Sequence, residues 1–300
     1  MTSKAPWWVA VVLLAAGCTD DGAAGDAGPE ADASTDSTAD GDAGGDLDAP
    51  APDGEDDAGD EADSPAGACP AVPDPAEVVI RMQHLRMTAP AAMAGALFNG
   101  LMNDLLAAES FVWLTRFSGL GSGTLAVTTG SGHKVPEREC TYAYLTLEYP
   151  AAETVMTESG LEFAMAGAPI PVANVALWAR GTTWPDEPLT VLPLRELSIH
   201  GAFAPGRLAI GSCDEVEGTC VDDGVLESRV TVTDARATPI PSLGITLCGL
   251  ISGDVGTPAD MPDDCTGPRP WDDEPDTTVD GEEAWILTGT FAGSAVNVEP

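Results

Sequence analysis

The sequence predicts a mainly β fold with one packed helix (α+β): a large antiparallel sheet, arranged as a sandwich or a curled half-barrel, preceded by a disordered tail. Apolar residues recur with a period of two in about ten short segments that turn residues separate. One segment has the apolar period of a helix instead. Six cysteines are spread over residues 69–300, which predicts a disulfide-bonded domain.

The helix is predicted over residues 89–108. Thr88 is placed to cap its first turn, and Pro90 suits the first helical position. Asn99 and Asn103 mark the polar side of this helix. Its apolar stripe recurs at every fourth position, at Met93, Leu97, Leu101 and Leu105.

The strands alternate between two faces. Within 111–117, Phe111 and Phe117 share one face, whereas Val112 and Leu114 share the other. A pattern of many strands and one helix is typical of a sheet with a helix over one face. The predicted strands are 78–87, 111–117, 124–129, 142–149, 161–165, 172–180, 194–203, 207–211, 226–237, 243–251 and 285–298.

An even number of cysteines in an exported chain indicates disulfides, and six cysteines allow about fifteen pairings. Zinc is the competing interpretation, but no C-x-x-C pair occurs and the spacing does not suit a structural zinc site. The simplest pairing is local and joins Cys213 to Cys220 and Cys248 to Cys265, which leaves Cys69 for Cys140.

The segment before this domain is acidic and has almost nothing to bury. Residues 19–68 contain 17 Asp or Glu, no Lys or Arg and no aromatic residue. Such a composition cannot offset the entropy of ordering, so we expect a disordered linker.

The first 17 residues read as an export signal. One positive charge, Lys4, precedes an apolar run from Ala5 to Ala16, and small residues follow it. The run is shorter than the roughly 20 residues that a membrane-spanning helix needs.

Leu14-Ala15-Ala16-Gly17-Cys18 resembles the lipobox of bacterial lipoproteins. That family usually has Leu three places before the cysteine, where this chain has Ala15. The resemblance implies cleavage before Cys18 and attachment of diacylglycerol and an N-acyl chain, such as palmitate, to that residue. Thr19 in the next position favours the outer membrane under the sorting rule of enteric bacteria. The predicted organisation is therefore a signal peptide over 1–17, lipid-attached Cys18 with its linker over 18–68, and one domain over 69–300.

Charge restricts the partners. Residues 69–300 contain 32 Asp or Glu against 11 Lys or Arg, an excess of 21 negative charges. Nucleic acids require the opposite sign, so we predict none as a partner. The lipid on Cys18 is the expected contact with the membrane, and a protein or an apolar ligand is the remaining kind of partner.

No catalytic pattern is evident. The three histidines, His84, His133 and His200, lack the H-E-x-x-H spacing, and no Gly-x-Ser-x-Gly elbow occurs. The acidic stretch from Asp276 begins like a Ca²⁺ loop, but its twelfth position is Leu287 where that loop needs Glu. We therefore predict no catalytic residue, no metal and no cofactor.

The sequence thus predicts a membrane-anchored extracytoplasmic lipoprotein that is a non-catalytic binding or structural module of the cell envelope. Two alternatives remain open. In one, the domain carries an apolar ligand between the helix and the sheet. In the other, it is a hydrolase whose nucleophile the sequence does not identify.

Overall fold

The computed structural model describes residues 76–145, 149–214, 217, 219–241, 243–253, 265 and 269–299. The predicted signal peptide, Cys18, the acidic linker and Cys69 lie outside these residues. The helices are α1 (Ala91–Ala94), α2 (Ala96–Ala107), α3 (Val232–Ala237) and α4 (Leu247–Ser252). The strands are β1 (Glu77–Ala89), β2 (Trp113–Ser118), β3 (Thr124–Lys134), β4 (Thr141–Tyr144), β5 (Ala152–Ser159), β6 (Glu162–Met165), β7 (Ile170–Leu177), β8 (Thr190–Ala202), β9 (Ala209–Ile210), β10 (Ser212–Asp214), β11 (Thr219–Val221), β12 (Gly224–Thr231), β13 (Pro239–Ile240), β14 (Ile245–Thr246), β15 (Thr277–Val279), β16 (Glu282–Ala295) and β17 (Asn297–Val298).

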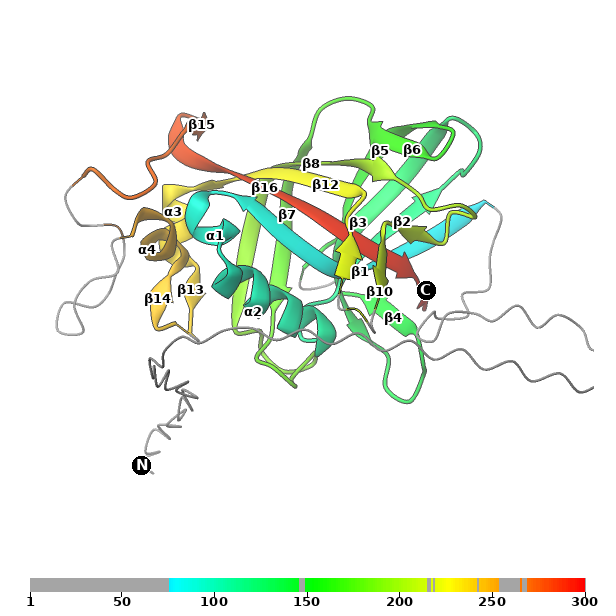
Figure 1. Cartoon of the computed structure of the whole chain (residues 1–300), viewed down its shortest axis with the longest axis horizontal. Helices are drawn as coiled ribbons and strands as arrows, with labels where there is room; N and C mark the ends of the chain where they lie inside the picture. The colour runs from blue at the N-terminus through cyan, green and yellow to red at the C-terminus, as the bar shows by residue number, and fades with distance from the viewer. Residues whose placement is uncertain are drawn as a thin grey trace, which may run out of the picture. The chain divides into compact units, whose positions relative to one another are not determined.

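The main sheet is mostly antiparallel and curls until it closes (Figure 1). Its ladder runs from β1 through β2, β3, β5, β6, β8, β12 and β16, and β16 pairs with β1 again. Every pairing in this ring is antiparallel. The predicted mainly β class is confirmed, and closure explains how so many strands avoid exposed edges.

Aromatic side chains meet inside the ring. Phe117 on β2, Phe163 on β6 and Phe203 after β8 have ring centroids 4.8–5.1 Å apart. Because β2 and β6 are not neighbours in the ladder, their contact crosses the interior. All three are almost fully buried, so side chains fill this level of the ring.

The alternation predicted for 111–117 is confirmed. Phe111 and Phe117 belong to the interior cluster. Val112 and Leu114 point to the other face, where they pack with Tyr142 in a separate cluster.

The predicted helix 89–108 is present but differs in three ways. β1 continues through Ala89, so Thr88 is not its cap; Pro90 precedes α1, and Gly95 separates α1 from α2. Leu97, expected in the apolar stripe, is 73% exposed. The buried side of the two helices is formed by Met93, Met102, Leu105 and Leu106.

The two asparagines predicted on the polar side face the sheet instead. Asn103 accepts a hydrogen bond from the amide of Leu85 at 3.0 Å and donates one to its carbonyl at 2.8 Å. Asn99 makes the same two bonds with Met87, at 2.7 and 3.1 Å. Asn99 and Asn103 are four positions apart on α2, which is a rise of about 6 Å along the helix axis. Leu85 and Met87 are two positions apart on β1, which is a similar distance of roughly 6.6 Å along the strand. The side-chain amides therefore replace a strand partner.

This replacement is needed because β2 pairs only with the first part of β1, over residues 77–81. Beyond it, β1 keeps β16 on one edge and would leave the other edge without a strand. Helix α2 lies beside β1 and covers that edge (Figure 1).

Two predicted strands are partly helical. The second half of 226–237 is α3, and most of 243–251 is α4. Both helices begin with a threonine cap: Thr231 accepts from the amide of Asp234, and Thr246 from that of Gly249. Short apolar runs do not distinguish a strand from a buried helix by period alone, which explains the error.

Candidate functional site

Two disulfides link segments within the described part of the chain. Cys213–Cys220 joins β10 to β11, and Cys248–Cys265 joins α4 to the segment that precedes β15. These are the two local pairs that the spacing predicts. Cys140 is disulfide-bonded too; Cys69, its expected partner, lies outside the described residues. The disulfides indicate an extracytoplasmic protein.

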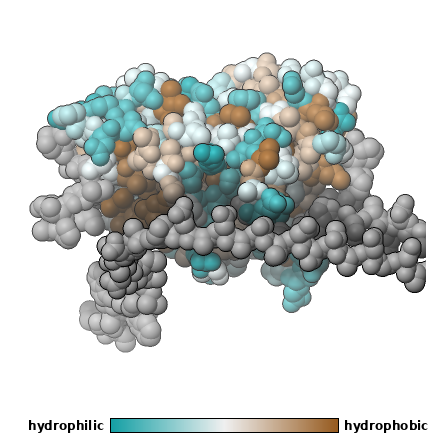
Figure 2. Space-filling model, viewed as in Figure 1, coloured by the Kyte–Doolittle hydropathy of each residue, from teal (hydrophilic) through white to brown (hydrophobic). Residues whose placement is uncertain are grey.

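No helix in the described part of the chain has both the length and the apolar character needed to cross a membrane. On the face seen in Figure 2, hydrophobic and hydrophilic residues are interspersed. The large hydrophobic residues that are exposed lie on different elements, among them Leu97 on α2, Val155 on β5 and Val172 on β7.

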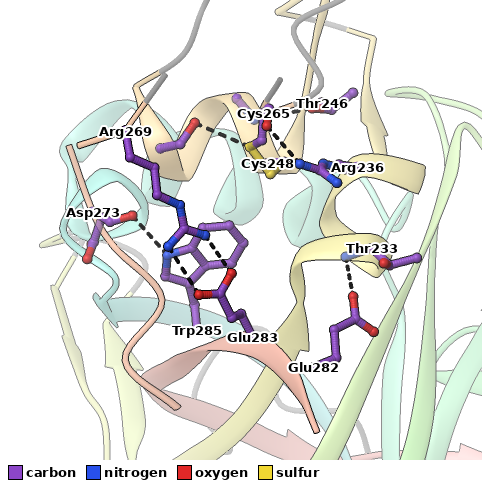
Figure 3. The surroundings of a disulfide bond; sticks show 12 residues. Thr233, Arg236, Thr246, Cys248, Cys265, Arg269, Asp273, Glu282, Glu283 and Trp285 are labelled. Atoms are coloured by element: carbon purple, nitrogen blue, oxygen red, sulfur yellow. Dashed lines mark hydrogen bonds and ion pairs between the residues drawn. A yellow bond between two sulfur atoms is a disulfide. The ribbon is translucent and has the colours of Figure 1, made fainter. Parts of the chain in front are cut away.

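A pocket of about 390 Å³ lies beside the second disulfide (Figure 3). Helix α3 forms one wall, the first residues of β16 form another, and the segment that carries Cys265 completes it. Its lining residues are Val232, Thr233, Arg236, Cys265, Arg269, Trp271, Glu282 and Glu283. The pocket therefore presents both signs of charge next to an indole ring.

One wall of the pocket is formed by Arg269 and the residues that contact its guanidinium. Its guanidinium lies 4.3 Å from the ring centroid of Trp271 and donates two hydrogen bonds to Glu283, at 2.6 and 3.1 Å. Glu274 lies 3.2 Å from the same guanidinium. The hydrogen bonds to Glu283 raise the pKa of Arg269 further above its ordinary value.

The indole of Trp271 packs against the indole of Trp285. The two rings are stacked with centroids 5.9 Å apart, and Trp285 donates its indole N–H to the carbonyl of Asp273 at 3.0 Å. Because Trp285 is buried in the ring, this wall of the pocket rests on the core.

The opposite wall retains hydrogen-bonding capacity. Arg236 donates one Nη2 hydrogen bond to the carbonyl of Cys265 at 2.8 Å, and Glu282 accepts one from the amide of Thr233 at 2.8 Å (Figure 3). Among the described residues, the other guanidinium N–H groups and the second Glu282 oxygen have no protein partner. These groups can bind an acceptor and a donor of a ligand.

Helix α3 holds this wall in position. Asp234, in its first turn, receives two hydrogen bonds from Arg195 on β8, at 2.5 and 3.1 Å. The hydrogen bond to Asp234 raises the pKa of Arg195. The pair ties α3 to the ring at a point close in sequence to Thr233 and Arg236.

The three histidines lie apart from this pocket. His84 shares a hydrogen bond of 2.8 Å with Asp222, and Asp222 also accepts one from Thr290 at 3.0 Å. His133 stacks on Trp184, and His200 lies exposed on β8. Among the described residues, no histidine hydrogen-bonds a serine and no group of three metal-ligating side chains forms.

A second cluster of charged groups lies outside the ring. Tyr142 donates a hydrogen bond to Glu109 at 2.7 Å, and Lys134 lies 2.9 Å from the same carboxylate. Burial raises the pKa of Glu109, but the bonds from Lys134 and Tyr142 and the charge of Arg81 outweigh it, so the pKa is lowered. Burial raises the pKa of Tyr142 to about 12.

Of the residues that line the pocket, the sequence pattern singled out Cys265 as a disulfide cysteine, but it did not identify a pocket or the role of Arg236 and Arg269 in it. Arg236 follows β12, whereas Arg269 and Glu282 come more than thirty positions later. They meet because the disulfide and the pairing of β12 with β16 bring their segments together. A comparison with protein families, curated proteins and solved structures finds no match for this chain.

Proposed function

We propose that the chain is a lipid-anchored extracytoplasmic lipoprotein, held at the outer membrane through Cys18, whose domain is a non-catalytic binding module. The pocket beside Cys248–Cys265 is the observation that carries the binding role. It combines a fixed wall, in which Arg269 is engaged on Trp271, with an opposite wall where Arg236 and Glu282 retain free hydrogen-bonding groups. A volume of about 390 Å³ suits a small polar molecule.

The chemistry of the two walls defines the ligand class. A ligand with an anionic or hydroxyl acceptor for Arg236 and an ammonium or hydroxyl donor for Glu282 satisfies both groups. Two arginines and two glutamates line the pocket, so their charges balance and a ligand without a large net charge suits it best. A small zwitterion or polyhydroxylated molecule is therefore the proposed occupant.

The carrier alternative has less support. It needs a cavity between the helix and the sheet, yet Phe117, Phe163 and Phe203 occupy the ring interior in mutual contact. The helix α2 contacts β1 through asparagine hydrogen bonds and leaves Leu97 exposed, so its apolar residues do not line a binding space as a stripe.

The binding role is tested on protein purified from membranes. Native mass spectrometry of that protein reports a co-purified small molecule together with the acyl chains. The variants Arg236→Gln and Glu282→Gln should each lose the bound mass, and Arg86→Gln should keep it. Arg86 is a suitable control because it is exposed and makes no ion pair with a described residue. Retention of the ligand in both pocket variants would place it elsewhere and contradict the proposal.

The anchor is tested separately. Cys18→Ser removes the acceptor of the lipid, and the protein should then move from the membrane fraction to the soluble fraction, since acyl chains supply the stable anchoring. Sedimentation of this variant with membranes would contradict the lipoprotein assignment without bearing on the pocket.

One observation favours the hydrolase alternative. Asp222 holds Nδ1 of His84, which leaves Nε2 to accept a proton, as in a histidine–carboxylate pair that activates water. In that case His84→Asn should abolish hydrolysis of a chromogenic carboxylic ester at unchanged stability. Equal hydrolysis by the variant and the wild type would contradict this alternative. The pair of His84 and Asp222 would then only link β1 to the β11–β12 connection.

A further inference from the structure

A five-residue motif, W-x-D-E-P, occurs twice in the chain. The first copy runs from Trp184 to Pro188, in the connection between β7 and β8, and the second from Trp271 to Pro275, before β15. Each motif tryptophan has an aromatic neighbour at stacking angle: His133 for Trp184, at 4.6 Å, and Trp285 for Trp271, at 5.9 Å. The two copies therefore share residue types and an aromatic support.

In the second copy, the motif holds a guanidinium. Arg269 lies over the indole of Trp271, and Glu274, the glutamate of the motif, lies 3.2 Å from it. Glu274 also accepts a hydrogen bond from the amide of Trp271 at 3.0 Å, which fixes the carboxylate relative to the ring. In this copy an indole face and a carboxylate of the motif contact one guanidinium together, and Glu283 on β16 accepts its two hydrogen bonds.

In the first copy, no cation from the described part of the chain takes that position. Among the described residues, no basic side chain forms an ion pair with Asp186 or Glu187. Arg180, the nearest basic residue in sequence, lies 3.8 Å from Asp104 instead. The indole of Trp184 remains 41% exposed although His133 stacks on it.

The first copy is also held in place before anything binds. Trp178 donates its indole N–H to the carbonyl of Asp186 at 2.8 Å, and the amide of Asp186 donates to the carbonyl of Thr183 at 3.1 Å. The amide of Gly181 donates to the hydroxyl of buried Ser110 at 2.9 Å, so the connection is attached to the core. A loop ordered in advance loses little entropy when it binds.

We propose that the loop around Trp184 is a docking site for an arginine or lysine side chain of a basic protein segment. The cation lies against the indole of Trp184, and Asp186 and Glu187 supply the negative charge. The large excess of acidic residues attracts such a segment before contact. This inference does not depend on the pocket beside Cys248–Cys265.

The test uses the full disulfide-bonded chain and a short end-blocked peptide with one central arginine. A second peptide carries citrulline, which has the shape of arginine without its charge. Isothermal titration at low salt should show binding of the arginine peptide, and Trp184→Ala should weaken it about fivefold or more. The citrulline peptide should bind as weakly to the wild type as the arginine peptide binds to this variant.

Glu187→Gln and Glu162→Gln form a matched pair, because each removes one exposed carboxylate. Glu187→Gln should weaken binding of the arginine peptide several-fold, and Glu162→Gln should change it less than twofold. Circular dichroism of all variants should match the wild type, since both sites are on the surface. Equal affinity of the wild type and Trp184→Ala for the arginine peptide would overturn the proposal, because binding would then not involve the indole. Equal affinity of the wild type for the arginine and citrulline peptides would also overturn it, because binding would then not involve the cation.

Discussion

Replacing Asn103 by alanine should destabilise the domain although this residue looks like a solvent-facing position of an amphipathic helix. The substitution removes both hydrogen bonds that its side chain makes to Leu85. Leu85 is only 5% exposed, so water has little access to replace the hydrogen bonds of its amide and carbonyl. The edge of β1 would lose two of the four asparagine hydrogen bonds by which α2 covers it.

The magnitude follows from these two bonds. Each contributes about 1 kcal/mol net, and a buried backbone group left without a partner costs about 1–3 kcal/mol. Alanine is a better helix former than asparagine by roughly 0.5 kcal/mol, which offsets a small part. The free energy of unfolding should therefore fall by about 2–3 kcal/mol. Asn103→Asp keeps the acceptor and loses the donor, so its effect should be intermediate.

The assay is urea unfolding followed by tryptophan fluorescence, with the disulfides intact. Leu97→Ala is the matched control on the same helix, because Leu97 is 73% exposed, and it should change the free energy by less than about 0.5 kcal/mol. The amphipathic pattern alone predicts the reverse order. A Leu97→Ala variant that is less stable than Asn103→Ala would refute the strand-replacing role of the asparagines.

Three further outcomes are expected. Burial raises the pKa of Tyr142 to about 12 from an ordinary 10.0, so its contribution to folding stability should be undiminished below pH 10 and fall between pH 10 and about 12. Burial also raises the pKa of Tyr144, so unfolding of Tyr142→Phe across this pH range should show a smaller fall than unfolding of the wild type, and tyrosinate absorbance follows the two titrations. Gly211→Ala should destabilise by about 2 kcal/mol or more in thermal unfolding, because φ is +65° there and an added Cβ would lie 2.0 Å from the carbonyl of Val221. Ser131→Ala should cost about 1–3 kcal/mol, because its buried hydroxyl bonds two backbone groups of β7 at 3.0 and 3.1 Å; unchanged urea unfolding would contradict this.

Local pattern predicted much of the sheet. The alternation of Phe111 and Val112 places the two side chains on opposite faces because a strand has a period of two. The pairs Cys213–Cys220 and Cys248–Cys265 follow from short separations in the chain, which bring their Cα atoms within bonding reach. These features depend on neighbours in sequence, and the structure agrees with them.

The helix shows where local pattern fails. The stripe of Leu97 and Leu101 has the right period, but the partner of α2 is a strand edge rather than a flat apolar face. An edge presents amide and carbonyl groups, and asparagine side chains satisfy them better than leucines do. The choice between the two faces of α2 therefore depends on β2 ending its pairing at Arg81.

The sequence by itself determined the β-rich class, the faces of its clearest strands and the local disulfides. It also predicts the lipid anchor at Cys18, which lies outside the described residues. Tertiary structure decided the closure of the ring, the orientation of Asn99 and Asn103 toward the sheet and the placement of Arg236 and Arg269 around one pocket. These features join residues far apart in the chain, and the free energy of such contacts depends on pairing and burial that no local pattern encodes.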